Sequence, residues 1–147
     1  MCVRREKWQL SKPRYRWWSF ARAMIRDFPK LSMDMEEIHR QNISANLSGM
    51  PKGGGSGRMT EQTALRQLPP DDQAAYEAVT KAKNITAMHK DGSEHLRLIE
   101  LMYWKKETMT AKSASVVMHI SYETAKRWHG AFVRLVGRCY GFRTEKK

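Results

Sequence analysis

Apolar and basic positions recur along the first part of the chain with the period of a helix. Over residues 12–28, one face collects apolar side chains and the other collects polar and basic ones. The apolar face comprises Trp17, Trp18, Phe20, Ala21, Met24, Ile25 and Phe28, and the other face comprises Tyr15, Ser19, Arg22 and Arg26. Pro29 is interpreted as the stop of this helix, because proline ends or kinks helices. Acidic residues then open a second helix over about residues 33–46, so residues 1–48 are predicted to form a basic and aromatic helical hairpin.

A glycine-rich segment follows the hairpin. Residues 49–59 contain five glycines, which is typical of a flexible linker. A phosphate-binding loop is disfavoured, because it would need a Gly-Lys-Ser/Thr ending that this segment lacks. The hairpin is too short to bury its tryptophans alone. Its apolar face is therefore expected to dock either on the part of the chain after the linker or on a second subunit.

The pattern after the linker predicts a second helical module over residues 60–142, followed by a disordered tail over residues 143–147. A short helix is expected up to Leu68, and the run of two prolines and two aspartates at 69–72 opens another. The core face expected for that helix is Ala75, Val79, Ala82, Ile85 and Met88. Residues 94–105 are apolar around most of the helix circumference and are expected to form the buried centre. No alternating run indicates a β-strand, so the predicted fold class is all-α.

Residues 110–138 have the pattern of two helices joined by a tight turn. Ser121 is of a residue type preferred at helix N-caps, and it directly follows the apolar Ile120. Ala114 and Ser115 are small where two helices must approach closely. His119 holds the turn position at which glycine would ease a positive φ, a conformation that histidine tolerates better than most residues. The stretch therefore predicts a helix-turn-helix.

The second helix of this pair has an apolar side and a cationic side. The apolar side comprises Ala125, Trp128, Phe132, Leu135, Val136 and Cys139, and the other side comprises Glu123, Lys126, Arg127, Arg134 and Arg138. Gly130 and Gly137 are also assigned to the cationic side. Either these glycines lower the stability of the helix without compensation, or close approach of a phosphate backbone compensates for the loss. A structural hairpin within a helical bundle is the alternative interpretation of the pair.

A helix of this kind fits the major groove of DNA, where its first two turns meet base edges. The candidates for reading bases are Tyr122, Glu123, Thr124, Lys126 and Arg127. The candidates for contacting phosphates are Ser121, Lys112, Arg134, Arg138, Arg22 and Arg26. Arginine and lysine side chains donate to guanine, and a glutamate accepts from cytosine.

The net charge supports a polyanionic partner. The chain carries 27 basic and 15 acidic residues, a formal charge of +12. Nine basic and two acidic side chains lie in residues 1–30, and eight basic and two acidic ones lie in residues 108–147. The middle of the chain is close to neutral. Solvated basic surfaces without a ligand are the alternative to this interpretation.

Other function classes find no positive signal in the sequence. No apolar run is long enough for a membrane span, and no signal peptide precedes the first helix, so the cytoplasm is the expected compartment. Cys2 and Cys139 form no CxxC pair, and the five histidines lack partners at metal-ligand spacing. No nucleophilic triad or carboxylate pair is placed for catalysis. We therefore expect neither an enzyme nor a metal, and no cofactor.

Three stretches resemble the RinA family of phage transcriptional activators. They are residues 58–66, residues 96–104 and, most specifically, residues 119–136, which begin His119-Ile-Ser-Tyr-Glu-Thr-Ala-Lys-Arg-Trp128. The resemblance implies a phage-encoded, sequence-specific DNA-binding protein that activates late genes. It also implies a C-terminal module similar to the promoter-reading region 4 of sigma factors, and contact with host RNA polymerase.

The expected function is therefore an all-α transcriptional activator that reads double-stranded promoter DNA, with possible assembly into a homo-oligomer. Two alternatives remain open from the residues alone. One is a DNA-packaging protein of the small-terminase kind, which uses such a motif for ring assembly. The other is an interaction protein whose basic ends bind an acidic partner.

Overall fold

The structure is a computed structural model that describes residues 15–48 and 67–143, and of residues 45–48 the backbone alone. All regular elements in this part of the chain are helices, as the sequence predicted. In order they are α2 (Trp18–Ser48), α4 (Pro70–Ala87), α5 (Gly92–Ile99), the π-helix η1 (Glu100–Trp104), α6 (Ala111–Met118) and α7 (Tyr122–Tyr140). The predicted linker at 49–59, most of the short helix before Leu68 and the tail after residue 143 lie outside the described residues.

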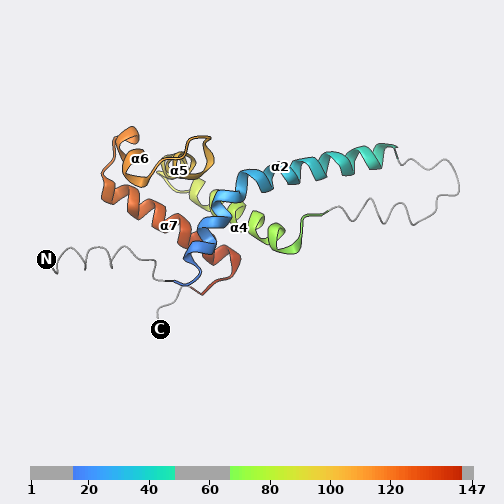
Figure 1. The fold of residues 1–147 in the computed structure, drawn as a ribbon, viewed down its shortest axis with the longest axis horizontal. Coiled ribbons are helices and arrows are strands. Elements are labelled where there is room, and N and C mark those ends of the chain that lie inside the picture. Colours follow the sequence, from blue (N-terminus) through green and yellow to red (C-terminus); the bar gives the residue numbers. More distant parts are fainter. Residues whose placement is uncertain (1–14, 49–66, 144–147) are drawn as a thin grey trace.

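The predicted N-terminal hairpin is wrong in the described residues. One helix, α2, continues through Pro29 and changes direction along its length (Figure 1). A proline cannot supply the N–H that the carbonyl oxygen four residues earlier needs. That carbonyl belongs to Ile25, and the indole Nε1 of Trp104 donates to it at 2.7 Å. The helix therefore passes the proline because a side chain distant in sequence replaces the missing donor.

The segments before and after the predicted linker share one core. The apolar face of α2 contributes Ala21, Met24, Ile25, Phe28 and Leu31 to a cluster with residues of α4, η1 and α7. Figure 1 shows α7 lying against α4 and the first part of α2, while the second part of α2 extends beyond the other helices. Two docking partners were expected for the aromatic face, the later part of the chain or a second subunit. In the structure this face packs against the later part of the same chain.

Aromatic rings join the start of α2 to the end of α7. Trp17 stacks on Tyr15 and on Phe142, with ring centroids 4.9 and 5.3 Å apart. The indole Nε1 of Trp17 also donates to the carbonyl oxygen of Arg143 at 3.1 Å. These contacts hold α7 against α2 at the end opposite α6.

A second, smaller core is formed by residues of α5, η1, α6 and the start of α7. Its buried members are Leu98, Leu101, Ala114 and Ala125. Ala114 and Ser115, the small residues predicted where the two helices approach closely, are both buried, and Ala125 of α7 is fully buried as well. The helix expected over residues 94–105 begins earlier, at Gly92, and its last turn widens into η1.

Two residues of the expected core face of α4 are exposed. Ala75, Val79 and Ala82 are buried as predicted, but Ile85 and Met88 remain 41% and 85% exposed.

In the ranges 15–48 and 67–143, none of the helices combines the length and apolar character required to cross a bilayer.

Candidate nucleic-acid interface

The turn between α6 and α7 is fixed by backbone hydrogen bonds. His119 has φ of 58° and ψ of 39°, the left-handed conformation expected at this position. The amide of His119 donates to the carbonyl of Val116 at 3.2 Å, and that of Ile120 donates to the carbonyl of Ser115 at 3.0 Å. This pair of bonds is a Schellman motif, which satisfies carbonyls at the end of α6. Three residues therefore separate α6 from α7, in a defined conformation.

Both helices begin at hydroxyl caps. Thr110 Oγ1 accepts from the amide of Ser113 at 3.2 Å, and Ser121 Oγ accepts from the amide of Thr124 at 3.1 Å. Ser121 is thus the N-cap of α7, as predicted. The Thr124 and Ser121 hydroxyl oxygens also lie 2.7 Å apart. This bond restrains the Thr124 side chain, which the sequence proposed as a base reader.

The apolar side of α7 is packed as the sequence predicted. Ala125, Phe132 and Val136 are buried, and so is Val133 next to them. Gly137 differs from the prediction, because it faces this packed side. A Cβ added to Gly137 would lie 2.3 Å from ring carbon Cζ3 of Trp17. The indole of Trp17, the residue just before α2, requires a glycine there, and a phosphate backbone is not needed to explain it.

The opposite side of α7 carries exposed cations. Arg127, Arg134 and Arg138 are all exposed, and among the described residues no carboxylate forms an ion pair with any of them. These three residues, spaced at seven and four, lie along one line of the helix and are called the arginine stripe below. Gly130 and Ala131 lie between them, so the middle of the stripe has little side-chain bulk.

The N-terminal turn of α7 holds the remaining candidates for base reading. Tyr122 is 44% exposed, and the Lys126 ammonium lies 4.6 Å from its ring centroid. Lys126 Nζ also forms an ion pair with Glu123 Oε1 at 3.3 Å, although both side chains are largely exposed. Such an exposed pair contributes little to stability and is readily exchanged for another partner. These side chains remain able to meet a ligand.

The predicted phosphate contacts have different surroundings in the structure. Ser121 and Lys112 are exposed at the N-termini of α7 and α6. Arg22 instead points to a polar cluster under α2, where its Nε donates to the Tyr103 hydroxyl at 2.9 Å. Arg26, one turn further along α2, is exposed, and its charge acts on the same tyrosine. Of the two α2 arginines, Arg22 therefore already has a side-chain partner within the fold, whereas Arg26 is exposed.

The polar cluster under α2 was not anticipated from the sequence. The Tyr103 hydroxyl lies 2.6 Å from His129 Nε2 and also accepts from Arg22. Burial, together with the nearby Arg22 charge, lowers the pKa of His129 to about 4. Burial raises the pKa of Tyr103. The cluster joins α2, η1 and α7 with neutral imidazole and phenol groups, so its geometry fits a structural role.

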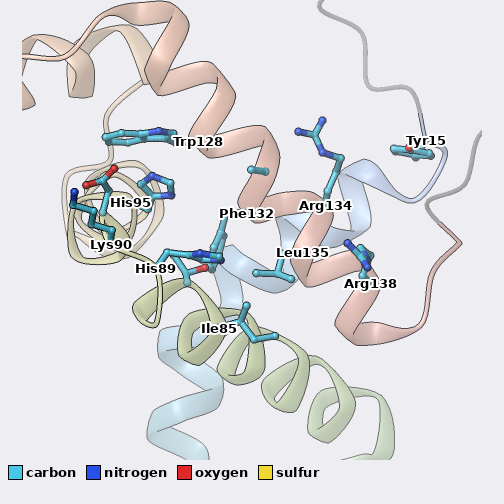
Figure 2. A pocket seen from close by; sticks show the side chains of 13 residues that line it. Tyr15, Ile85, His89, Lys90, His95, Trp128, Phe132, Arg134, Leu135 and Arg138 are labelled. Carbon is cyan, nitrogen blue, oxygen red and sulfur yellow. The ribbon is translucent and has the colours of Figure 1, made fainter.

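An open groove of about 810 Å³ runs beside the arginine stripe (Figure 2). Trp128, Phe132 and Leu135 line it from α7, and Ile85 lines it from α4. Its polar rim consists of Tyr15, Thr86, His89, Lys90, Asp91, His95, Arg134 and Arg138. The sequence pattern does not reveal this groove, since Ile85 falls at a core-face spacing on α4.

In the described ranges, no group of histidine, cysteine or acidic side chains is placed to hold a metal ion.

The chain matches no protein-family model, no curated protein and no solved structure. The function is therefore argued from the geometry of α6, α7 and their surroundings.

Proposed function

We propose that the chain is a sequence-specific DNA-binding protein that regulates transcription, with α6, the turn at His119 and α7 acting as a helix-turn-helix. The observation that carries the proposal is the two-sided character of α7. One side is fixed on the core, and the other presents three arginines that no carboxylate neutralises among the described residues. An exposed helix with free cations is suited to the major groove of duplex DNA.

In this proposal the first turns of α7 and its later turns have different roles, because they are too far apart along the helix axis to contact the same part of the DNA. Arg127 and Arg138 are eleven residues apart, which corresponds to about 16 Å along a helix. The major groove is about 12 Å wide, so one helix does not place both residues against base edges equally well. Tyr122, Glu123, Lys126 and Arg127 at the first turns are the base readers in this proposal. Arg134 and Arg138 contact phosphates, as Ser121 and Lys112 do at the two helix N-termini.

Thr124 is given a smaller role than the sequence suggested. Its hydroxyl is hydrogen-bonded within the N-cap of α7. A thymine methyl would therefore meet the Thr124 methyl group and not its hydroxyl.

The resemblance to RinA activators extends the proposal to late-gene promoters of a phage and to contact with host RNA polymerase. The residues that carry this resemblance most specifically, 119–136, contain the turn, the cap and the first fifteen residues of α7. Double-stranded DNA is the partner that the exposed arginines support directly.

The test is selection of binding sites from random duplex DNA by the purified full chain. A specific regulator enriches one motif, and binding weakens with salt at a slope of about −0.9 per phosphate neutralised. Arg127→Ala is expected to relax the enriched motif at one position and cost roughly 1–3 kcal/mol of discrimination. Arg138→Ala is expected to weaken all sequences alike. Lys106→Ala, an exposed lysine outside α6 and α7, serves as the control.

Enrichment of no motif would contradict sequence-specific reading. A flat salt profile would contradict DNA binding altogether.

A further inference from the structure

The groove beside α7 has an apolar floor and a cationic rim. Ile85 on the floor is 41% exposed, and Leu135 and Trp128 are partly exposed next to it. The rim carries Lys90, Arg134 and Arg138 against a single acidic side chain, Asp91, with His89 and His95 between them. An exposed apolar surface rimmed by polar residues is typical of a protein-binding site.

We infer that this groove binds an acidic, amphipathic helical segment of a partner protein. The inference goes beyond DNA binding and does not depend on it. Apolar side chains of the segment would cover Ile85 and Leu135, and its carboxylates would meet Lys90 and the two arginines. Such helix-in-groove binding uses apolar residues at helical spacing, with the flanking charges giving specificity.

Nucleic acid fits the groove less well than a peptide does. Duplex DNA offers no apolar stripe that would cover Ile85. Stacking of unpaired bases needs an open ring face, but His95 lies 4.1 Å from the Trp128 ring centroid on the groove side. Tyr15, at the other end, is already stacked on Trp17. Each of these two rings therefore already has one face covered by a neighbouring ring.

The occupant is expected to come from another protein. Residues 1–14, 49–66 and 144–147 each contain more basic than acidic residues, so none complements this rim. One acidic surface of the described residues, formed by Asp27, Asp34, Asp71 and Asp72, lines a hollow of about 350 Å³ between α2 and α4. Two hollows do not interlock, and a second copy of the chain therefore does not fill the groove with this surface.

The experiment measures fluorescence anisotropy of a labelled peptide on the full chain. The peptide is about five helical turns long, with leucines on one face and glutamates elsewhere. A peptide of the same composition in scrambled order, which lacks the apolar face, is the matched probe. Dissociation constants below roughly 100 μM are expected for the amphipathic peptide, and at least tenfold weaker binding for the scrambled one.

The variants are placed off α7, because Arg134 and Arg138 belong both to the groove and to the arginine stripe. Ile85→Ser and Lys90→Glu are each expected to weaken peptide binding by on the order of five- to tenfold, while duplex DNA binding changes less than twofold. Met33→Ser and Lys106→Glu also alter exposed side chains, but elsewhere on the surface, and should change neither. Because the altered positions are exposed, the unfolding midpoint should stay close to that of the unchanged chain.

Each other outcome overturns the inference. Equal binding of the scrambled peptide would mean attraction by charge alone. A tenfold loss of duplex DNA or oligothymidine binding on Ile85→Ser would assign the groove to nucleic acid. Concentration-dependent dimers in sedimentation that Ile85→Ser dissociates would assign it to a second copy. Loss of peptide binding in Met33→Ser as well would remove its link to the groove. The proposed function is tested separately, by the motif that the full chain enriches and by the effect of Arg127→Ala on that motif. The two proposals can therefore fail separately.

Discussion

Two glycines of α7 that look alike in the sequence have opposite surroundings. Gly137 lies against the Trp17 ring, whereas the atoms nearest to a Cβ added at Gly130 are 3.8 Å away, on Arg134 and Trp18. The sequence placed both on the cationic side, because a helical pattern does not reveal that the indole of Trp17, distant in sequence, covers one turn. Only the packed position requires glycine.

Substitution of these glycines by alanine is expected to change stability in opposite directions. Gly137→Ala should destabilise the fold by roughly 1–3 kcal/mol, because the methyl group displaces Trp17. Gly130→Ala should stabilise it by up to about 1 kcal/mol through helix propensity. Urea denaturation monitored by circular dichroism measures both changes. Equal destabilisation by the two substitutions would show that Trp17 does not pack where the structure places it.

His129 is expected to make stability depend on pH. Its pKa is about 4 in the folded chain and 6.5 when unperturbed, so the unfolded chain binds the proton first as pH falls. The free energy of unfolding therefore decreases between about pH 6.5 and 4, by on the order of 3 kcal/mol. His129→Gln should remove most of this slope, although His95, whose pKa burial also lowers, retains a part in the same direction. Parallel slopes for the two proteins would contradict a buried neutral imidazole.

At the scale of elements, the pattern predicts what is local and misses what depends on distant residues. The cap at Ser121, the left-handed His119 and the two sides of α7 follow from neighbouring residues, and the structure has each of them. The stop at Pro29 failed, because the donor that satisfies Ile25 comes from Trp104, 79 residues away. The groove escaped prediction for a similar reason, since only tertiary packing leaves Ile85 uncovered.

The bond from Trp104 to Ile25 is expected to be coupled to Pro29. Trp104→Phe keeps an aromatic ring but leaves the Ile25 carbonyl without a donor, which should cost about 1–3 kcal/mol. In a Pro29→Ala background the helix regains its own N–H, and the same change should cost less. A double-mutant cycle of unfolding free energies measures this coupling. Additive effects would mean that the indole is not replacing the proline's missing donor.

For the whole molecule, the glycine-rich run suggested two modules, whereas the described helices share one main core. Composition indicates where a chain is easily bent, but it does not indicate what the flanking apolar faces pack against. Five side chains of α2 are buried in this core. Burial of each such side chain contributes roughly 1.5–3 kcal/mol, except the smaller alanine.

The shared core predicts that the two parts of the chain stay together when the backbone is cut between them. A protease site inserted within residues 49–59 and cleaved after folding should yield fragments that co-elute in size-exclusion chromatography. They should also unfold in one transition, at a midpoint that depends on concentration because the tether is gone. Met24→Asp in the same protein should separate them, because it places a charge in the apolar core that α2 shares with the later helices. Free separation of the unaltered fragments would show that the packing of α2 on α7 is too weak to hold them together, and it would leave the two-module arrangement as the better account.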